Sequence, residues 1–154
     1  MTHFPVQVAA WLEELSSRLK VVDWVSFNPG APTCTVGFED GSAVLLEWDD
    51  EQERLMALAL LGRPPEHAAL AVYRTVLAYN GMWRENAGAR IVAVDAEGEL
   101  ALMFELAVQA LTLERLRLML ESVRSAASAW GRYVADPADE HDGPPVAPLH
   151  AQRV

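Results

Sequence analysis

The chain has 154 residues, of which 51% are hydrophobic, and its formal net charge is -10. These values are typical of one globular domain, and the negative charge disfavours nucleic acid and anionic membranes, which attract Lys and Arg. No apolar run approaches the roughly 20 residues of a membrane-spanning helix, the first 20 residues do not resemble a signal peptide, and the single cysteine, Cys34, has no partner for an internal disulfide. We therefore expect a cytosolic protein that does not insert into a membrane.

The first predicted element is a helix over residues 6–20. Its apolar residues recur every three or four positions, as on the buried side of an amphipathic helix, and Pro5 suits the first turn. Residues 28–32, N-P-G-A-P, have the composition of a loop. The apolar stripe consists of Val8, Trp11, Leu12, Leu15, Leu19 and Val22.

A β-hairpin is predicted next. Residues 33–39 alternate between apolar and polar positions, Asp40-Gly41 is a typical hairpin turn, and residues 43–48 form the returning strand. Residues 54–61 are nearly all apolar and fit either a strand or a helix by pattern alone. Their position after two hairpin strands favours a third strand.

The second half of the chain also contains both predicted helices and predicted strands. A helix is predicted from Pro65 or Glu66 to about Tyr79, and Asn80-Gly81 is a plausible stop signal. Strands over residues 90–94 and 99–106 follow, joined by the turn 95–98. The last helix begins near Thr112, a residue that favours the N-cap. Its stripe consists of Leu113, Leu116, Leu120, Val123, Ala127 and Trp130.

These elements predict a single α+β domain over residues 1–135. The order is α-β-β-β-α-β-β-α, with a twisted antiparallel sheet packed by three helices, because strands joined by tight turns are antiparallel. Residues 136–154 contain four prolines and no periodicity, and we expect them to form a disordered tail.

The sequence offers no residues in a pattern that supports catalysis. The four histidines, His3, His67, His141 and His150, have no partner at metal-ligand spacing. Cys34 lies among apolar neighbours, which favours an inert buried thiol. The acidic clusters at 49–51 and 95–99 coincide with predicted turns. We therefore expect no enzyme activity, no metal and no cofactor.

The apolar residues are more informative about function. Three helices on a single sheet layer are too little structure to bury every predicted stripe, so a dimer, a bound partner or both are expected. The simpler interpretation is that the aromatic residues fill the core. The five tryptophans are Trp11, Trp24, Trp48, Trp83 and Trp130.

The ordered set of local motifs resembles the class I type III secretion chaperones, the Tir-chaperone (CesT) family, over residues 6–133. The segment CTVGFEDGSAVLLE at 34–47 is similar to that family's first hairpin, and LALLGRPP at 58–65 is similar to its third strand and the break after it. Similar segments follow at 76–80, 88–94, 100–103 and 126–132.

The resemblance implies a homodimeric cytosolic chaperone in bacteria that binds the extended N-terminal segment of one secreted effector and keeps it soluble. A regulator or adaptor of the same fold that sequesters a protein partner is the alternative, and a small enzyme is third. The effector is expected to contact the first helix and hairpin through Val8, Leu12, Leu15, Val36, Phe38, Leu46 and Trp48, although core packing is an alternative role for each. The dimer interface is expected at Val72, Tyr73, Val76, Trp83, Leu102 and Phe104.

Overall fold

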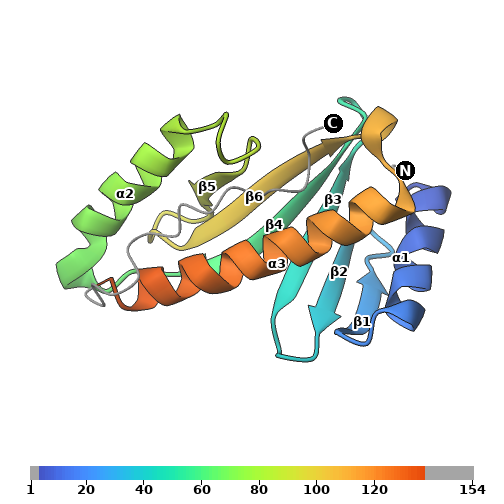
Figure 1. The fold of residues 1–154 in the computed structure, drawn as a ribbon, viewed down its shortest axis with the longest axis horizontal. Coiled ribbons are helices and arrows are strands. Elements are labelled where there is room, and N and C mark those ends of the chain that lie inside the picture. Colours follow the sequence, from blue (N-terminus) through green and yellow to red (C-terminus); the bar gives the residue numbers. More distant parts are fainter. Residues whose placement is uncertain (1–3, 138–154) are drawn as a thin grey trace.

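The computed structural model describes residues 4–137. The first helix, α1 (Val6–Arg18), leads into four consecutive strands. The helix α2 (Ala69–Gly81) follows a short 3₁₀ turn, and the long helix α3 (Leu113–Ala135) comes last (Figure 1). The strands are β1 (Val22–Phe27), β2 (Thr33–Phe38), β3 (Ala43–Asp49), β4 (Arg54–Gly62), β5 (Arg90–Ala93) and β6 (Leu100–Ala107).

All strands of the described chain belong to one antiparallel sheet, in the order β1-β2-β3-β4-β6-β5. The α+β class and the predicted order of elements are confirmed, with one additional strand, β1, before the three predicted first. A register shift between Val22 and Trp24 explains why the sequence pattern did not reveal β1, because the extra residue interrupts its alternation.

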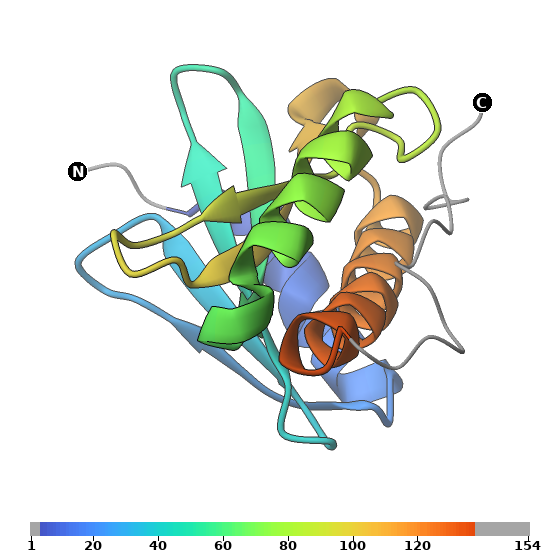
Figure 2. The ribbon, with the colours of Figure 1, turned by 90° about the vertical axis from the view of Figure 1, so that its left-hand side faces the viewer.

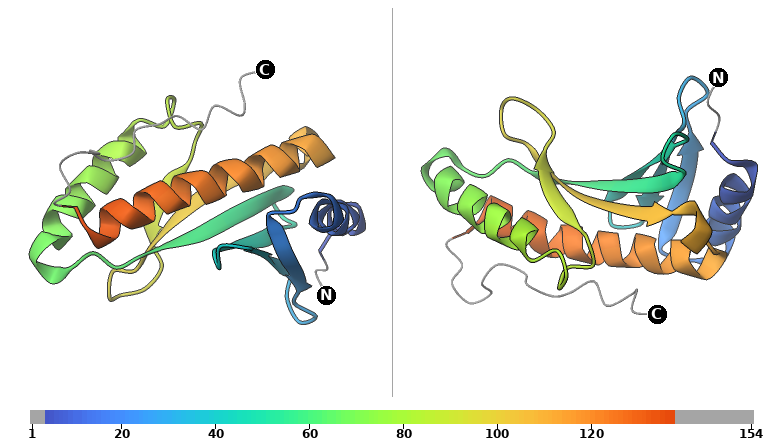
Figure 3. Two further views of the ribbon diagram at one scale, coloured as in Figure 1. Left: turned by 60° about the horizontal axis from the view of Figure 1, so that its bottom comes forward. Right: turned by 90° about the horizontal axis from the view of Figure 1, so that it is seen from above.

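The three helices lie on the same face of the sheet. The long helix α3 crosses the sheet diagonally, with α2 and α1 near its two ends (Figure 1). Turned by 90°, the molecule shows α2 and α3 to one side of the strands (Figure 2), and the view from above shows the same layers (Figure 3). Alternate residues of β3 and β4 and one stripe of each helix meet in a single core.

Local signals in the sequence fix the ends of several elements. The Thr112 hydroxyl accepts a hydrogen bond from the Arg115 amide at 3.1 Å, which caps α3 as predicted. The predicted stop of α2 is confirmed at Gly81, where the preceding residue, Asn80, has a second role. Its side chain bonds both the amide and the carbonyl of Ile91 at 2.9 Å, so it fastens the end of α2 to β5.

The predicted Asp40-Gly41 turn joins β2 to β3, with Gly41 at a φ of 81°. Hydrogen bonds from Ser42, together with the guanidinium of Arg124, lower the pKa of Asp40 to about 2. The carboxylate therefore stays ionised at neutral pH, and its 2.8 Å ion pair with Arg124 connects this turn to α3. Apart from Asp136 and Pro137, the predicted C-terminal tail lies outside the described residues.

Candidate functional site

The face of the sheet opposite the helices carries its own set of side chains, and we call it the open face. Directly paired residues of neighbouring strands point to the same side, so the register defines this face. Within residues 4–137 no helix packs against it (Figures 2 and 3). One row across the sheet from β1 to β5 consists of Ser26, Thr35, Leu45, Leu58, Met103 and Arg90.

One half of the open face is apolar. Trp24, Leu45 and Leu60 expose 46%, 38% and 65% of their surface, which is unusual for large apolar side chains in one patch. Such a patch is stabilised when another apolar surface covers it. This apolar half consists of Trp24, Leu45, Met56, Leu58, Leu60, Val92 and Met103.

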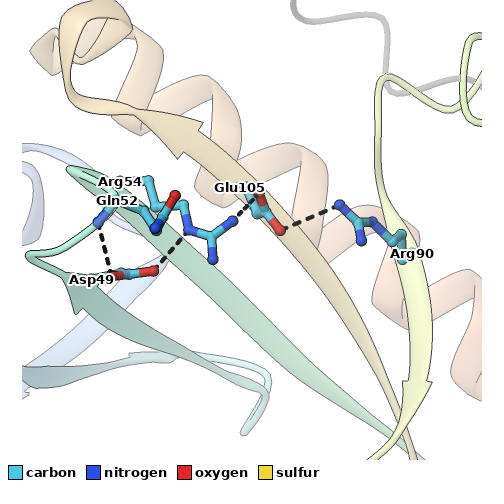
Figure 4. A network of polar contacts seen from close by, with 5 residues as sticks. All are labelled: Asp49, Gln52, Arg54, Arg90 and Glu105. Atoms are coloured by element: carbon cyan, nitrogen blue, oxygen red, sulfur yellow. Dashed lines mark hydrogen bonds and ion pairs between the residues drawn. The ribbon is translucent and has the colours of Figure 1, made fainter.

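The other half of the open face is charged. Arg54 bonds Asp49 at 2.9 Å and Glu105 at 2.7 Å, and Glu105 also pairs with Arg90 at 3.4 Å. Figure 4 shows this chain of contacts running from β3 across to β5, with α3 behind the strands. The amide of Gln52 donates a further hydrogen bond to Asp49 at 3.1 Å.

This network sets the polarity of its half of the face. The hydrogen bond from Arg54 is the main cause of a lowered pKa at Asp49, and the same bond raises the pKa of Arg54. Both groups therefore remain charged at neutral pH. Because solvent screens such partly exposed pairs, they add little to the stability of the fold. Their main effect is to give the apolar half of the open face a polar boundary.

The sheet also has two free edges in the described chain. β1 pairs with β2 alone, and β5 pairs with β6 alone. The outer backbone amides and carbonyls of an edge strand are available to pair with another chain. An extended peptide added beside β1 would lie next to Trp24 and so continue from the edge onto the open face.

A second exposed apolar region lies on α2, and we call it the α2 surface. Leu70 and Leu77, two turns apart on one side of the helix, expose 64% and 70% of their surface. A groove beside Leu77 separates α2 from the β5–β6 turn, and there the Tyr73 hydroxyl donates to the Gly98 carbonyl at 3.1 Å. Trp83 and Val94, in neighbouring segments, are also exposed.

The structure places all the residues expected to contact an effector in the protomer's core. Each is at most 8% exposed, because each points from α1, β2 or β3 into the core between the helices and the sheet. In the protomer these side chains hold the elements together and are covered by their neighbours. That an effector touches them stays a prediction. The residues are Val8, Leu12, Leu15, Val36, Phe38, Leu46 and Trp48.

The residues expected at the dimer interface divide into two groups. Val72, Val76, Leu102 and Phe104 are buried between α2, α3 and the sheet, while Tyr73 is half-buried beside the groove. Trp83 is exposed, and the guanidinium of Arg84 lies 4.9 Å from its ring centroid. Of the expected residues, only Tyr73 and Trp83 are therefore accessible to a second copy in the protomer, and the interface itself stays a prediction.

The sequence contained one signal for the open face that the prediction of binding residues did not use. Residues 55–61 are apolar at every position, whereas a strand with one face in water normally alternates. A strand that is apolar on both faces is expected to be covered on both. Leu58 and Leu60 belong to the face that the helices leave uncovered.

The remaining candidate groups have ordinary surroundings. Burial raises the pKa of the Cys34 thiol to about 12, so it stays protonated and unreactive at neutral pH. His67 is exposed in the 3₁₀ turn before α2, and the other three histidines lie outside the described residues. Over residues 4–137 no cluster of side chains suits a metal ion. None of the helices in this range combines the length and apolar character needed to span a bilayer.

Solved structures share this architecture of three helices on one antiparallel sheet. A chain of the ExsC-ExsE complex is 20% identical with a TM-score of 0.71, covering 89% of this chain and 100% of that one. A chain of the HopA1-SchA chaperone-effector complex is 18% identical with a TM-score of 0.65, covering 81% of this chain and 93% of that one. A chain of the heterodimeric ExoU-SpcU complex from the type III secretion system of Pseudomonas aeruginosa is 20% identical with a TM-score of 0.59. The match covers 84% of this chain and 98% of that one. These likenesses show the fold.

Residues 11–131 match the Tir chaperone protein (CesT) family. This match spans most of the chain, and the chain therefore belongs to that family, which confirms the resemblance drawn from its motifs. No curated protein matches the sequence. The family is one of chaperones, so the function to be explained is the binding of another protein.

Proposed function

We propose that this chain is a type III secretion chaperone that acts in the bacterial cytosol. It binds the extended N-terminal segment of a secreted effector and keeps that segment soluble until secretion. The observation that carries the proposal is the open face, where large apolar side chains are exposed beside a free sheet edge. Membership of the chaperone family supports it, as do the HopA1-SchA chaperone-effector complex and the type III secretion complex ExoU-SpcU, whose structures share this fold.

The open face suits an extended client better than a folded one. Its apolar half crosses several strands, so one part of an extended segment is able to pair with the β1 edge while apolar side chains of another part lie on the face. Ordering a flexible segment costs conformational entropy, and several separated anchors are needed to offset that cost.

Charge favours the same kind of client. The chain carries 22 acidic and 12 basic side chains, so its field attracts basic segments and speeds their encounter with the protein. On the open face Glu47 is exposed between the apolar and charged halves, and it forms no ion pair within residues 4–137. A client segment with both apolar and basic residues fits this surface.

Co-expression with each secreted protein encoded beside the gene tests the function. We expect one such protein to become soluble and to co-purify, and limited proteolysis of the complex to leave its N-terminal segment protected. If deletion of that segment left the complex intact, or if only a folded partner bound, the secretion role would be wrong. A complex with a folded regulator would instead support the alternative role of a sequestering adaptor.

We further propose that two copies associate through the α2 surface. Leu70 and Leu77 are exposed on one side of α2, and the groove beside Leu77 offers room for side chains of the second copy. A twofold interface uses the same patch from both copies, so a single substitution acts twice.

Leu77→Asp is expected to convert the dimer to a monomer while leaving the protomer folded. Leu77 is 70% exposed in the protomer, so an aspartate there meets water, whereas in the dimer two carboxylates would be buried close together. Light scattering after gel filtration measures the mass, and circular dichroism reports the fold. Ser125→Asp, which adds the same charge on the exposed side of α3, should remain dimeric. A dimer that survives Leu77→Asp would exclude the α2 surface as the interface.

A further inference from the structure

A glycine stands next to the last residue of β2, at a position where the backbone conformation does not require one. Gly37 has no left-handed φ, unlike Gly41 and Gly62, so its conformation suits any residue. Glycine inside a strand destabilises it by roughly 0.5–1 kcal/mol relative to alanine. A reason for Gly37 is therefore to be found in the space around it.

That space is filled by the side chain of Trp24. Trp24 on β1 is the direct cross-strand partner of Gly37, and both point to the open face. A Cβ atom built on Gly37 would overlap atoms Cε2, Nε1 and Cζ2 of the indole ring. The ring therefore lies against the bare backbone of β2, and Gly37 is buried beneath it.

The outer side of the same ring faces solvent. Trp24 is 46% exposed. Beyond Gly37 the row continues with Ala43, another small residue, so no bulky neighbour covers the ring from β2 or β3. The indole is thus held in place on one side and accessible on the other, at the boundary between the free β1 edge and the open face.

We propose that Trp24 is an anchor of the client surface, positioned by Gly37, and that it receives a large apolar side chain of the bound segment. This inference rests on the proposed function. Tryptophan is enriched among the residues that dominate binding at interfaces, and a ring that is already held in place loses little freedom on binding. Gly37 is a positioning residue, because it acts only by leaving space for the ring.

The probe is a synthetic 14-residue peptide of alternating leucine and lysine, whose leucines share one side of an extended strand, used in about 0.3 M salt to screen long-range attraction. Binding should shift the tryptophan emission to shorter wavelength, and Trp24→Phe should remove most of that shift while the peptide still binds. Trp83→Phe, which changes an exposed tryptophan elsewhere, should leave the shift in place. A shift that persists in Trp24→Phe would overturn the anchor role.

A double-mutant cycle tests the positioning role of Gly37. Trp24→Ala and Gly37→Ala are each expected to weaken peptide binding about tenfold, and the double variant should be no weaker than Trp24→Ala alone. Gly30→Ala is the control, since a Cβ there meets only ordinary contacts. Additive losses would show that Gly37 acts independently of the ring. If Gly37→Ala fails to fold, Trp24→Ala and the emission shift still decide the anchor role.

The outcomes separate this inference from the proposed function. The double variant Leu45→Glu/Leu60→Glu adds two charges to the apolar half of the open face. If Trp24→Ala binds the peptide like the wild type while this double variant does not, the open face binds clients and the anchor role is wrong. If neither variant changes the affinity, or if the wild-type chain does not bind the peptide, the open face is not the client surface.

Discussion

Leu45→Glu/Leu60→Glu is expected to abolish binding of the effector identified by co-expression while leaving the chaperone folded. The two residues lie on adjacent strands in the apolar half of the open face, and they are 38% and 65% exposed without a client. Their carboxylates therefore stay hydrated in the free protein. In the complex they would be covered by apolar side chains, and burying an unpaired charge is strongly unfavourable.

The expected loss of affinity exceeds about 100-fold, which corresponds to about 3 kcal/mol of binding free energy. Titration calorimetry measures the affinity, and near-ultraviolet circular dichroism confirms that the core is intact. Gln52→Glu/Gln109→Glu is the matched control, because it adds the same charge at exposed positions outside the apolar half. Loss of binding in this control as well would point to general repulsion of the client by added negative charge.

Trp130→Ala is expected to give the largest loss of stability. Trp130 on α3 is 2% exposed, and its ring makes edge contacts with Tyr79 at 4.9 Å and Tyr133 at 5.7 Å. The contact with Tyr79 joins α3 to α2, whereas Tyr133 lies on α3 itself. Removing a buried tryptophan leaves a cavity and costs about 4 kcal/mol, which should lower the midpoint of thermal unfolding by roughly 10 °C or more.

Tyr133→Phe provides the comparison for this position. It keeps the ring that packs on Trp130 and removes only the hydroxyl, which bonds Thr75 at 3.0 Å. The loss should be about 1 kcal/mol. Thermal and denaturant unfolding measure both variants. Equal losses in the two would show that the aromatic packing between α2 and α3 contributes little.

The surfaces proposed to bind a client and a second copy belong to separate parts of the fold. The α2 surface and the open face belong to different elements and to different sides of the sheet. Leu77→Asp is therefore expected to change the oligomeric mass while the apolar half of the open face stays intact. The double variant Leu45→Glu/Leu60→Glu is expected to lose client binding while the oligomeric mass stays the same. Testing both variants in both assays shows which surface carries each property.

The kinds of elements and their order could be predicted from the sequence, since both depend on local patterns. Three- and four-residue spacing defined the helices, alternation defined most strands, and Asp40-Gly41 and Thr112 marked a turn and a cap. The strand β1 was missed for a local reason too, because its register shift at Asp23 places Val22 and Val25 on one face and breaks the alternation.

Which apolar face becomes the core was decided only by the tertiary structure. Residues 55–61 are apolar on both faces, so the sequence alone offers two candidate interiors. The helices cover the face of Leu46 and Leu55, which makes those residues core, and the face of Leu45 and Leu58 is left open. Sequence periodicity indicates which side chains are expected to be buried. Only the packing of distant segments determines which segment buries them. The same holds for Trp24 and Gly37, which the pairing of β1 with β2 brings together.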